Sequence, residues 1–330
     1  MGFSRLPCWR SAIGSRLAVA LATMVAQDDR LLNDLVLRCL PTLVDLAEDR
    51  GGFVASHVVR YLDRFGHCGD PAQGFALLRC DCGASKVVPV RCHARALCPT
   101  CGGRAMASGA AHLIDRVLPD VTVRQWVLSV PWPRRYLFAA RPEICAGVRR
   151  RIWRELSRWY ERRAAELGDP GGSTGAVVVV QRFGSALNLN VHFHMLLLDG
   201  VFVADGDAVR WVRVPPPTTE EVQQLVTHIA RTVERWLDTQ GYGADEPCQE
   251  DVDDDANGVL LSASVAGRVA LGVRAGAKVR RLQRGFVRPF RLPRLCAEDR
   301  GYNLHAAVVI RHGDREGLER LCRYVLRPPL

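Results

Sequence analysis

The sequence predicts an α+β fold, in which a helical, cysteine-rich part precedes a longer part that mixes strands and helices. Three observations lead to this prediction. Apolar residues recur at three- and four-residue steps over residues 30–65, which is the spacing of amphipathic helices. Five of the 12 cysteines then lie within residues 80–101. From residue 121 the apolar residues alternate as in strands, and long helical patterns separate the alternating runs.

Length and charge suggest two domains and a polyanionic partner. The 330 residues predict a domain of residues 1–110 and a second of residues 111–330. The net charge of +10 comes almost wholly from arginine, since Lys86 and Lys278 are the only lysines. A guanidinium matches the geometry of phosphate oxygens, so nucleic acid is the expected partner. The alternative is a compositional bias, as in a chain encoded by GC-rich DNA.

The sequence contains no stretch that predicts a membrane-spanning helix, because no run of 18 or more uncharged apolar residues occurs. Residues 1–26 imitate an export signal, with arginines before the apolar run LAVALATMVA. We favour an amphipathic helix there, because the clustered cysteines indicate metal ligation in a reducing compartment. The expected location is therefore the bacterial cytoplasm, without a membrane partner.

The cysteine cluster has the pattern C-x-C-x9-C-x5-C-x2-C and predicts a structural zinc site. Four thiolates in tetrahedral geometry close such a site, and a metal would compensate for the small number of apolar residues nearby. Cys92 is an alternative ligand, and Cys68 and His93 are weaker ones. A redox C-x2-C motif is the competing interpretation, but it needs no second pair. The expected zinc ligands are Cys80, Cys82, Cys98 and Cys101.

The second part of the chain follows with strands and helices in turn. The runs 176–184 and 190–203 are expected to pair as an antiparallel hairpin, because a short loop-like segment separates them. Residues 244–258 are acidic and predict a surface loop, with a calcium site as a weak alternative. The other expected elements are strands at 121–133, 209–214 and 303–310 and helices at 144–167, 215–237 and 314–326, the second helix opened by a Thr218–Glu221 capping box.

Two histidines interrupt the apolar run NVHFHM. Side chains two residues apart in a strand project from the same face, so His192 and His194 can approach one metal ion while Phe193 faces the core. Gln181 on the preceding strand is the candidate third ligand, although it could also be an ordinary strand-end residue. Three ligands leave open positions, as Lewis-acid catalysis on a phosphoryl oxygen requires.

Four segments of the sequence resemble one known family in their joint order. The chain is similar to the HUH endonucleases, and in particular to the rolling-circle transposases of the insertion sequence ninety-one family. The resemblance implies a central antiparallel sheet with flanking helices, preceded by a zinc-binding module. The segments are RCHARALCPTCGGRAM, HLIDRVLPDVTVRQWVLSVPWPRRYLFA, QRFGSALNLNVHFHMLLLDGVF and RGYNLHAAVVIRHGDREGLERLCRYVLRPPL.

The resemblance also implies a reaction and its site. Tyr324 would attack a phosphodiester of single-stranded DNA, at element ends and target, and form a 5′-phosphotyrosine link during rolling-circle transposition. His192, His194 and Gln181 would hold a catalytic Mg²⁺ or Mn²⁺. From its pattern alone, Tyr324 is a residue at the edge of a helix's apolar stripe. Members with two tyrosines place them four residues apart, and Arg320 stands at the earlier position here, as in the single-tyrosine type.

Two other functions remain as alternatives. Family members usually continue past the proline pair, whereas this sequence ends at Leu330, so a truncated transposase that binds DNA without cleaving it is one alternative. A replication or conjugation initiator with the same chemistry is the other. The oligomeric state has no signal in the sequence.

Basic residues beside aromatic ones are the expected DNA contacts, because arginines bind the backbone and aromatic rings stack on bases. The alternative for the longest such stretch is an amphipathic helix with its tryptophans in the core. Residues 274–291 form a second basic candidate segment. The residues expected to contact DNA are Arg149, Arg150, Trp153, Arg154, Arg320 and Arg327.

Overall fold

In the computed structural model the chain divides into two compact units, the first chiefly residues 1–105 and the second chiefly residues 106–329. Most of the export-like start, of the acidic loop and of the basic segment 274–291 lies outside the residues that the structure describes. The expected amphipathic helix over residues 1–26 is wrong for residues 9–12, which form a strand because they pair with a later segment of the chain. The described residues are 9–12, 30–49, 52–184, 188–243, 256–279 and 294–328.

The first unit confirms the predicted helices and adds a small sheet that the sequence pattern did not predict. Its helices are α2 (Leu31–Glu48) and α3 (Ser56–Gly66), followed by a short 3-10 turn, η1 (Pro71–Gln73). Three antiparallel strands pair in the order β1-β2-β3, namely Trp9–Ala12, Phe75–Cys80 and Ser85–Pro89. Strand residues of the cysteine-rich segment are mostly exposed or half-buried, so their apolar pattern is weak.

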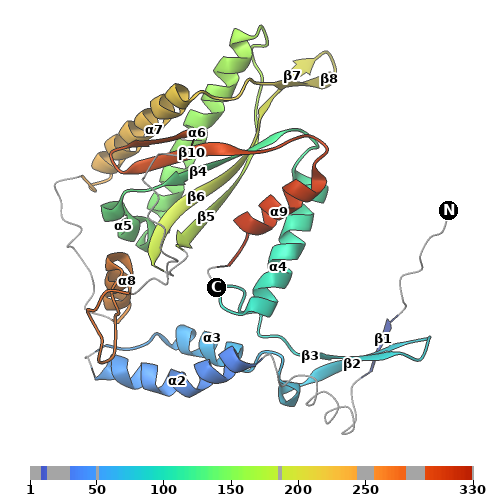
Figure 1. The fold of residues 1–330 in the computed structure, drawn as a ribbon, viewed down its shortest axis with the longest axis vertical. Helices are drawn as coiled ribbons and strands as arrows, with labels where there is room; N and C mark the ends of the chain where they lie inside the picture. Colours follow the sequence, from blue (N-terminus) through green and yellow to red (C-terminus); the bar gives the residue numbers. More distant parts are fainter. Residues whose placement is uncertain are drawn as a thin grey trace. The chain divides into compact units, whose positions relative to one another are not determined.

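The second unit is built on a five-stranded antiparallel sheet, which confirms the α+β class (Figure 1). The strands lie in the order β5-β6-β4-β10-β9, so the hairpin of β5 and β6 occupies one side of the sheet. Strand β6 is the second from that edge and pairs with both β5 and β4. The strands are β4 (Val123–Ser129), β5 (Ala176–Phe183), β6 (Leu189–Leu198), β9 (Cys296–Asp299) and β10 (Tyr302–Ile310).

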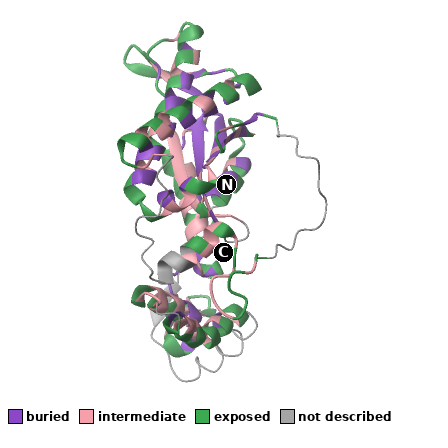
Figure 2. Cartoon of the chain, turned by 90° about the vertical axis from the view of Figure 1, so that its left-hand side faces the viewer, coloured by how far each residue is buried: buried purple, intermediate pink, exposed green. Residues whose placement is uncertain are grey.

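Helices pack on both faces of this sheet (Figure 1). The larger core lies between one face and helices α6 and α7, and the smaller core lies between the other face and helix α9. Buried residues are concentrated in the central strands (Figure 2). The capping box predicted at Thr218 and Glu221 opens α7. The helical segments are α4 (Pro99–His112), the π-helical turn η2 (Leu113–Val117), η3 (Trp132–Arg134), α5 (Arg135–Ala140), α6 (Pro142–Glu166), α7 (Thr219–Thr239), α8 (Ala256–Ala266) and α9 (Arg315–Val325).

The predicted strand at 190–203 is two strands, because the chain leaves the sheet at Asp199. Strand β7 (Gly200–Asp205) pairs with β8 (Ala208–Arg213) in a separate two-stranded sheet. The carboxylate of Asp199 is buried and accepts two hydrogen bonds from the guanidinium of Arg124, at 2.8 and 3.0 Å. Tyr160 also donates to it, at 3.0 Å. Breaking a buried pair of this kind typically costs about 3–5 kcal/mol, so the pair holds the end of β6 firmly to β4.

Within the described residues, no helix combines the length and the apolar character that crossing a membrane would need.

Candidate active site and cysteine cluster

Strand alternation places the histidine pair on the face of β6 that lies toward α9. Phe193, between the two histidines, is fully buried in the core on the opposite face. The ring centroids of His192 and His194 are 4.9 Å apart. Only 2% of His194 is exposed, whereas His192 is half-buried. The two imidazoles are therefore close enough to bind one ion from a single face of the strand.

Hydrogen bonds hold one nitrogen of each imidazole. Nδ1 of His192 lies 2.6 Å from the carbonyl oxygen of Asn190, and Nδ1 of His194 lies 2.9 Å from Nε2 of Gln125. Nε2 of His194 is buried without a hydrogen-bond partner among the described residues. A histidine that binds a metal through Nε2 carries its proton on Nδ1 and donates it, as His192 can to the carbonyl oxygen of Asn190. His194 can do the same when the Gln125 amide turns its oxygen toward Nδ1, because the amide nitrogen only donates.

Burial lowers the pKa of both histidines. The pKa of His194 falls to about 4, with smaller contributions from the charges of His192 and Arg327. The pKa of His192 is lowered by burial and by the positive charges of Arg327 and Arg135, while the hydrogen bond that it donates to the carbonyl oxygen of Asn190 raises it. Both imidazoles are therefore neutral at pH 7, which is the form that binds metal ions.

Gln181 lies on β5 between the histidine strand and helix α9. Its Cα lies opposite that of His192 in the antiparallel pairing of β5 and β6, so both side chains project from the same face. Its amide Nε2 donates to the carbonyl oxygen of Val325 at 2.8 Å, with a longer contact of 3.5 Å to that of Tyr324. The amide group points its nitrogen at α9 and leaves its oxygen as the atom that could bind a cation.

Tyr324 lies on α9 against this face of the sheet. Its neighbours Cys322 and Val325 are fully buried, whereas 45% of Tyr324 is exposed. The ring meets that of His194 edge to face, with 5.6 Å between centroids. The guanidinium carbon of Arg327 lies 4.6 Å from the centroid of the Tyr324 ring. The structure thus brings together the three expected metal ligands, the expected nucleophile and one of the expected DNA contacts.

Buried polar atoms around the histidines fit a site for a cation and an anion. Within the described residues, six buried side-chain nitrogen or oxygen atoms have no hydrogen-bond partner. Three of the six lie in His194, in Asn190, whose carbonyl binds His192, and in Arg135, whose charge acts on His192. Unpaired buried polar groups are costly, so their concentration indicates a place built for a ligand. The donor set of two imidazoles and an amide oxygen suits a divalent cation.

Two polar residues that act on the histidines, Gln125 and Arg135, could not be identified from the sequence pattern. Gln125 lies in β4, three residues after Thr122, and only its tertiary contact with His194 distinguishes it from any strand glutamine. Arg135 is the first residue of α5, beside Arg134 in a sequence with many arginines. No spacing rule links either residue to a histidine about 60 positions further along the chain.

The other expected DNA contacts lie elsewhere. Arg149, Arg150 and Arg154 are exposed on α6, and Trp153 packs partly into the larger core. That core covers the sheet face opposite the histidines, so the structure does not place these residues with Tyr324. Arg320 is exposed on α9 and forms an ion pair with Glu316 at 3.6 Å.

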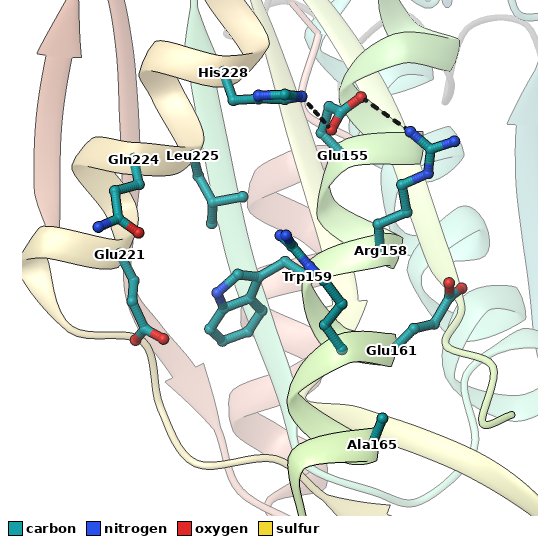
Figure 3. A pocket seen from close by; sticks show the side chains of 10 residues that line it. Glu155, Arg158, Trp159, Glu161, Ala165, Glu221, Gln224, Leu225 and His228 are labelled. Atoms are coloured by element: carbon teal, nitrogen blue, oxygen red, sulfur yellow. Dashed lines mark ion pairs between the residues drawn. The ribbon is translucent and has the colours of Figure 1, made fainter. Parts of the chain in front are cut away.

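A hollow between α6 and α7 lies on the same side as that core, away from the histidines (Figure 3). Glu155 lies in its wall and is only 8% exposed. Its carboxylate forms ion pairs with His228 at 3.1 Å and with Arg158 at 3.7 Å. The charge that could attract a ligand is therefore already compensated, and we assign no role to this hollow.

In the first unit, four buried cysteines gather into one cluster: Cys68, Cys92, Cys98 and Cys101. Sγ of Cys68 lies 3.8 Å from that of Cys101 and 3.5 Å from that of Cys98, and Sγ of Cys92 lies 3.7 Å from that of Cys101. Tetrahedral Zn²⁺ with Zn–S bonds of about 2.3 Å has sulfur–sulfur edges of about 3.8 Å. Backbone N–H groups of Ala94 and Cys101 point at two of the sulfurs. The four thiols therefore fit a closed structural zinc site.

The cluster differs from the ligand set that the spacing predicts. Cys98 and Cys101 belong to it, the alternative Cys92 belongs to it, and Cys68 completes it. Cys80 ends strand β2 and Cys82 is exposed in the following turn, so neither is part of the four-sulfur group. Their short separation along the chain reflects a β-turn between β2 and β3. His93 is exposed and also lies outside the cluster.

Comparison with family models assigns both parts of the chain. Residues 45–130, which contain the four clustered cysteines, match a model described as "Transposase zinc-binding domain". Residues 175–330, which contain Gln181, the histidine pair and Tyr324, match a model described as "Putative transposase". The comparisons with curated proteins and with solved structures found no match. The chain therefore belongs to the insertion sequence ninety-one family of transposases, which are enzymes that process DNA.

Proposed function

We propose that this transposase nicks and rejoins single-stranded DNA through a 5′-phosphotyrosine intermediate on Tyr324, as in rolling-circle transposition. The observation that carries the proposal is the edge-to-face contact of Tyr324 with His194, at 5.6 Å between ring centroids. A tyrosine on a helix and a histidine pair on a strand, 130 residues apart in sequence, meet at one half-open site. Such a meeting has no evident structural purpose, since 45% of the tyrosine remains exposed.

In the proposed reaction the phenolic oxygen of Tyr324 attacks the phosphorus of a phosphodiester and its proton passes to solvent. A new P–O bond to tyrosine forms, the bond from phosphorus to the 3′ oxygen breaks, and that oxygen takes up a proton from solvent and leaves as a 3′-hydroxyl. Attack of a 3′-hydroxyl on the phosphotyrosine reverses the step and rejoins DNA. The link conserves the energy of the phosphodiester, so rejoining needs no nucleotide cofactor.

His192, His194 and the amide oxygen of Gln181 would hold a Mg²⁺ or Mn²⁺ ion. Bound there, the ion would polarise the phosphoryl oxygen and stabilise the charge that develops on it. Gln181 would at the same time keep α9 in place, because its amide nitrogen binds the carbonyl oxygen of Val325. One residue thus relates the position of the ion to that of the nucleophile.

Helix α9 offers one nucleophile of this kind. The residue one helical turn before Tyr324 is Arg320, which is exposed and paired with Glu316. We therefore propose a single-tyrosine mechanism, in which one copy of the chain holds one covalent link at a time.

For the first unit we propose a structural Zn²⁺ bound by the thiolates of the cysteine cluster. The cluster packs with Phe65, Ala94 and a few half-buried apolar side chains, so it occupies the centre of a small core. A bound ion would hold together the segments after α3, after β3 and at the start of α4. The ligands are Cys68, Cys92, Cys98 and Cys101.

Trapping the covalent adduct tests the nucleophile, the metal and the substrate together. The full chain is incubated with Mn²⁺ and single-stranded DNA from the element ends, labelled at its 3′ end in one reaction and at its 5′ end in a parallel one. We expect label to migrate with the denatured wild-type protein and a 5′-labelled fragment to be released with a free 3′-hydroxyl. Tyr324→Phe should abolish the adduct, and Tyr242→Phe, a partly buried tyrosine elsewhere in the unit, should retain it.

Either of two results would overturn the proposal: no adduct with the wild-type chain, or an adduct that persists in Tyr324→Phe. DNA binding without any cleavage, unaffected by His192→Ala, would instead support a DNA-binding protein that lacks the reaction.

A further inference from the structure

Helices α6 and α7 expose arginines that have no acidic partner. Five arginines within residues 149–154 of α6 and residues 231–235 of α7 are exposed. Within the described residues, their side chains form no ion pair and no hydrogen bond. We call these five residues the arginine surface: Arg149, Arg150, Arg154, Arg231 and Arg235.

The central parts of the two helices contain few carboxylates, and those carboxylates already have partners. Residues 144–160 of α6 contain only Glu155, and residues 222–237 of α7 contain only Glu234. Their partners are His228 and Arg158 for Glu155, and Arg134 and Tyr302 for Glu234. Neither carboxylate is therefore available to the arginine surface, and the helices that carry its positive charge do not compensate for it.

The exposed arginines form two short rows. Arg150 and Arg154 are four residues apart, so they lie on one face of α6, about 6 Å apart along its axis. Arg231 and Arg235 have the same spacing and therefore share one face of α7. Each row offers two guanidiniums in line along a rigid helix.

Two contacts between the helices bring these rows together. The guanidinium carbon of Arg151 lies 3.9 Å from the centroid of the Trp236 ring. The carboxylate of Glu155 pairs with His228 at 3.1 Å. Three of these four residues are adjacent in sequence to an arginine of the surface. The two rows therefore flank the line along which α6 and α7 meet.

The arginines of α6 repel one another. Burial lowers the pKa of Arg151, and the charges of Arg154 and Arg150 lower it further. Like charges held side by side without carboxylates are unfavourable unless an anion compensates for them. A guanidinium suits phosphate in particular, because its planar group can donate two parallel hydrogen bonds. The surface therefore has the chemistry of a site for a phosphate-bearing polyanion.

The aromatic residues nearby are not free to stack on bases. Trp159 and Tyr160 are buried, and Trp153 packs partly into the larger core. Arg151 covers one face of the Trp236 ring. Single-stranded DNA binds where exposed rings stack on its bases, whereas a duplex stacks its bases internally and offers its phosphates. The surface therefore fits the backbone of double-stranded DNA better than a single strand.

We propose that the arginine surface is a second DNA site, which binds the backbone of double-stranded DNA. Membership of a transposase family makes DNA the expected polyanion. Helices α6 and α7 cover the sheet face opposite the histidines, so a duplex bound there leaves the histidine face to a single strand. Because the contacts are to phosphates, the site binds duplexes of any sequence. The inference does not depend on the proposed reaction of Tyr324.

Fluorescence anisotropy of a labelled, blunt-ended duplex tests the site without relying on catalysis. The zinc-loaded full chain carries Tyr324→Phe so that no covalent link forms, and the duplex has a sequence unrelated to the element ends. Titrations are repeated at several salt concentrations. Each phosphate contact releases counterions, so the logarithm of the affinity falls with the logarithm of the salt concentration, with a slope of about 0.9 per contact.

Glutamine variants identify the residues responsible, because glutamine removes the charge and has nearly the helix propensity of arginine. Arg150→Gln together with Arg154→Gln should reduce the slope by about 1.8, because two contacts are lost. Arg231→Gln together with Arg235→Gln should have the same effect. The four substitutions combined should reduce the slope by about 3.6.

Two comparisons control for general electrostatic attraction. The matched control pair is Arg213→Gln with Arg311→Gln, since both arginines are exposed, lie outside α6 and α7, and form no ion pair among the described residues. We expect this pair to leave the slope for the duplex unchanged. Single-stranded DNA of the same length should keep most of its slope in the four-residue variant. Thermal unfolding of each variant separates loss of binding from loss of fold.

An unchanged slope in the four-residue variant would overturn the inference, as would an equal reduction in the control pair. A reduction for single-stranded DNA as large as that for the duplex would overturn the assignment to double-stranded DNA. The adduct assay keeps these failures apart from that of the proposed function. A reduced slope without an adduct from the wild type would refute the nucleophile alone, and an adduct with an unchanged slope would refute the surface alone.

Discussion

The ligand set of the proposed zinc site leads to a sharp test, because sequence spacing and structure disagree on it. Cys68 and Cys82 both lie in the cysteine-rich part of the first unit, yet only Cys68 is buried with the other three thiols of the cluster. We expect Cys68→Ser to lose tight zinc binding and Cys82→Ser to retain it. The two variants remove the same atom from the same chain, so they are matched controls for each other.

The size of the effect follows from the geometry. The three sulfur–sulfur distances of 3.5, 3.7 and 3.8 Å are close to the edge of about 3.8 Å that tetrahedral zinc requires, so binding needs little rearrangement. Structural zinc in small domains contributes about 10–16 kcal/mol at pH 7, or roughly 2.5–4 kcal/mol for each of four thiolates. Loss of one thiolate should therefore weaken zinc binding by roughly 100- to 1,000-fold.

The assay is competition with a chromophoric zinc chelator, combined with thermal unfolding. We expect Cys68→Ser to release its zinc to the chelator at concentrations at which Cys82→Ser and the wild type retain it. Unfolding of the first unit should shift to lower temperature in Cys68→Ser alone, because the cluster forms the centre of a core with few other buried side chains. Release of zinc by Cys82→Ser together with retention by Cys68→Ser would refute the reasoning.

Two further predictions concern the histidine pair. Gln125→Leu removes the 2.9 Å contact with Nδ1 of His194 at a position only 4% exposed, and we expect Mn²⁺ affinity in the presence of DNA to fall about 10- to 100-fold. Gln125→Glu, which can accept from Nδ1–H, should retain affinity, and equal losses in both variants would contradict an orienting role. Because burial lowers the pKa of both histidines, to about 4 for His194, each stays neutral below the usual value of 6.5. We expect half of the Mn²⁺ affinity to be lost only below pH 6.5, because protonation of each imidazole sets in below its usual value. Loss of half the affinity at or above pH 6.5, measured by titration, would contradict the prediction.

Much of the second unit could be predicted from the sequence because its signals are local. Alternation along β6 predicts that Phe193 faces the core while the histidines share the other face, and both hold. The hairpin of β5 and β6 follows from two apolar runs and a short loop, and its register sets Gln181 opposite His192. The capping box of α7 is equally local.

Where the prediction and the structure differ, the deciding contact joins distant parts of the chain. The break between β6 and β7 at Asp199 depends on Arg124, which lies on another strand 75 residues earlier. The sequence around the arginines of α6 does not indicate which face of the sheet this helix covers. Cys80 and Cys82 are close in sequence, but a β-turn between two strands carries them away from the buried cluster.

The sequence by itself determined the main strands and the long helices of the second unit, the spacing of the two histidines and the presence of a tyrosine at the edge of the last helix, because periodicity and backbone geometry act over a few residues. Only the tertiary structure decided that Cys68 joins the cluster, that Gln125 contacts His194, and that Arg134 pairs with Glu234 in the core. The physical reason is that side chains acquire partners through the packing of whole elements. Residue spacing carries no information on a contact that depends on which face of a sheet a helix covers.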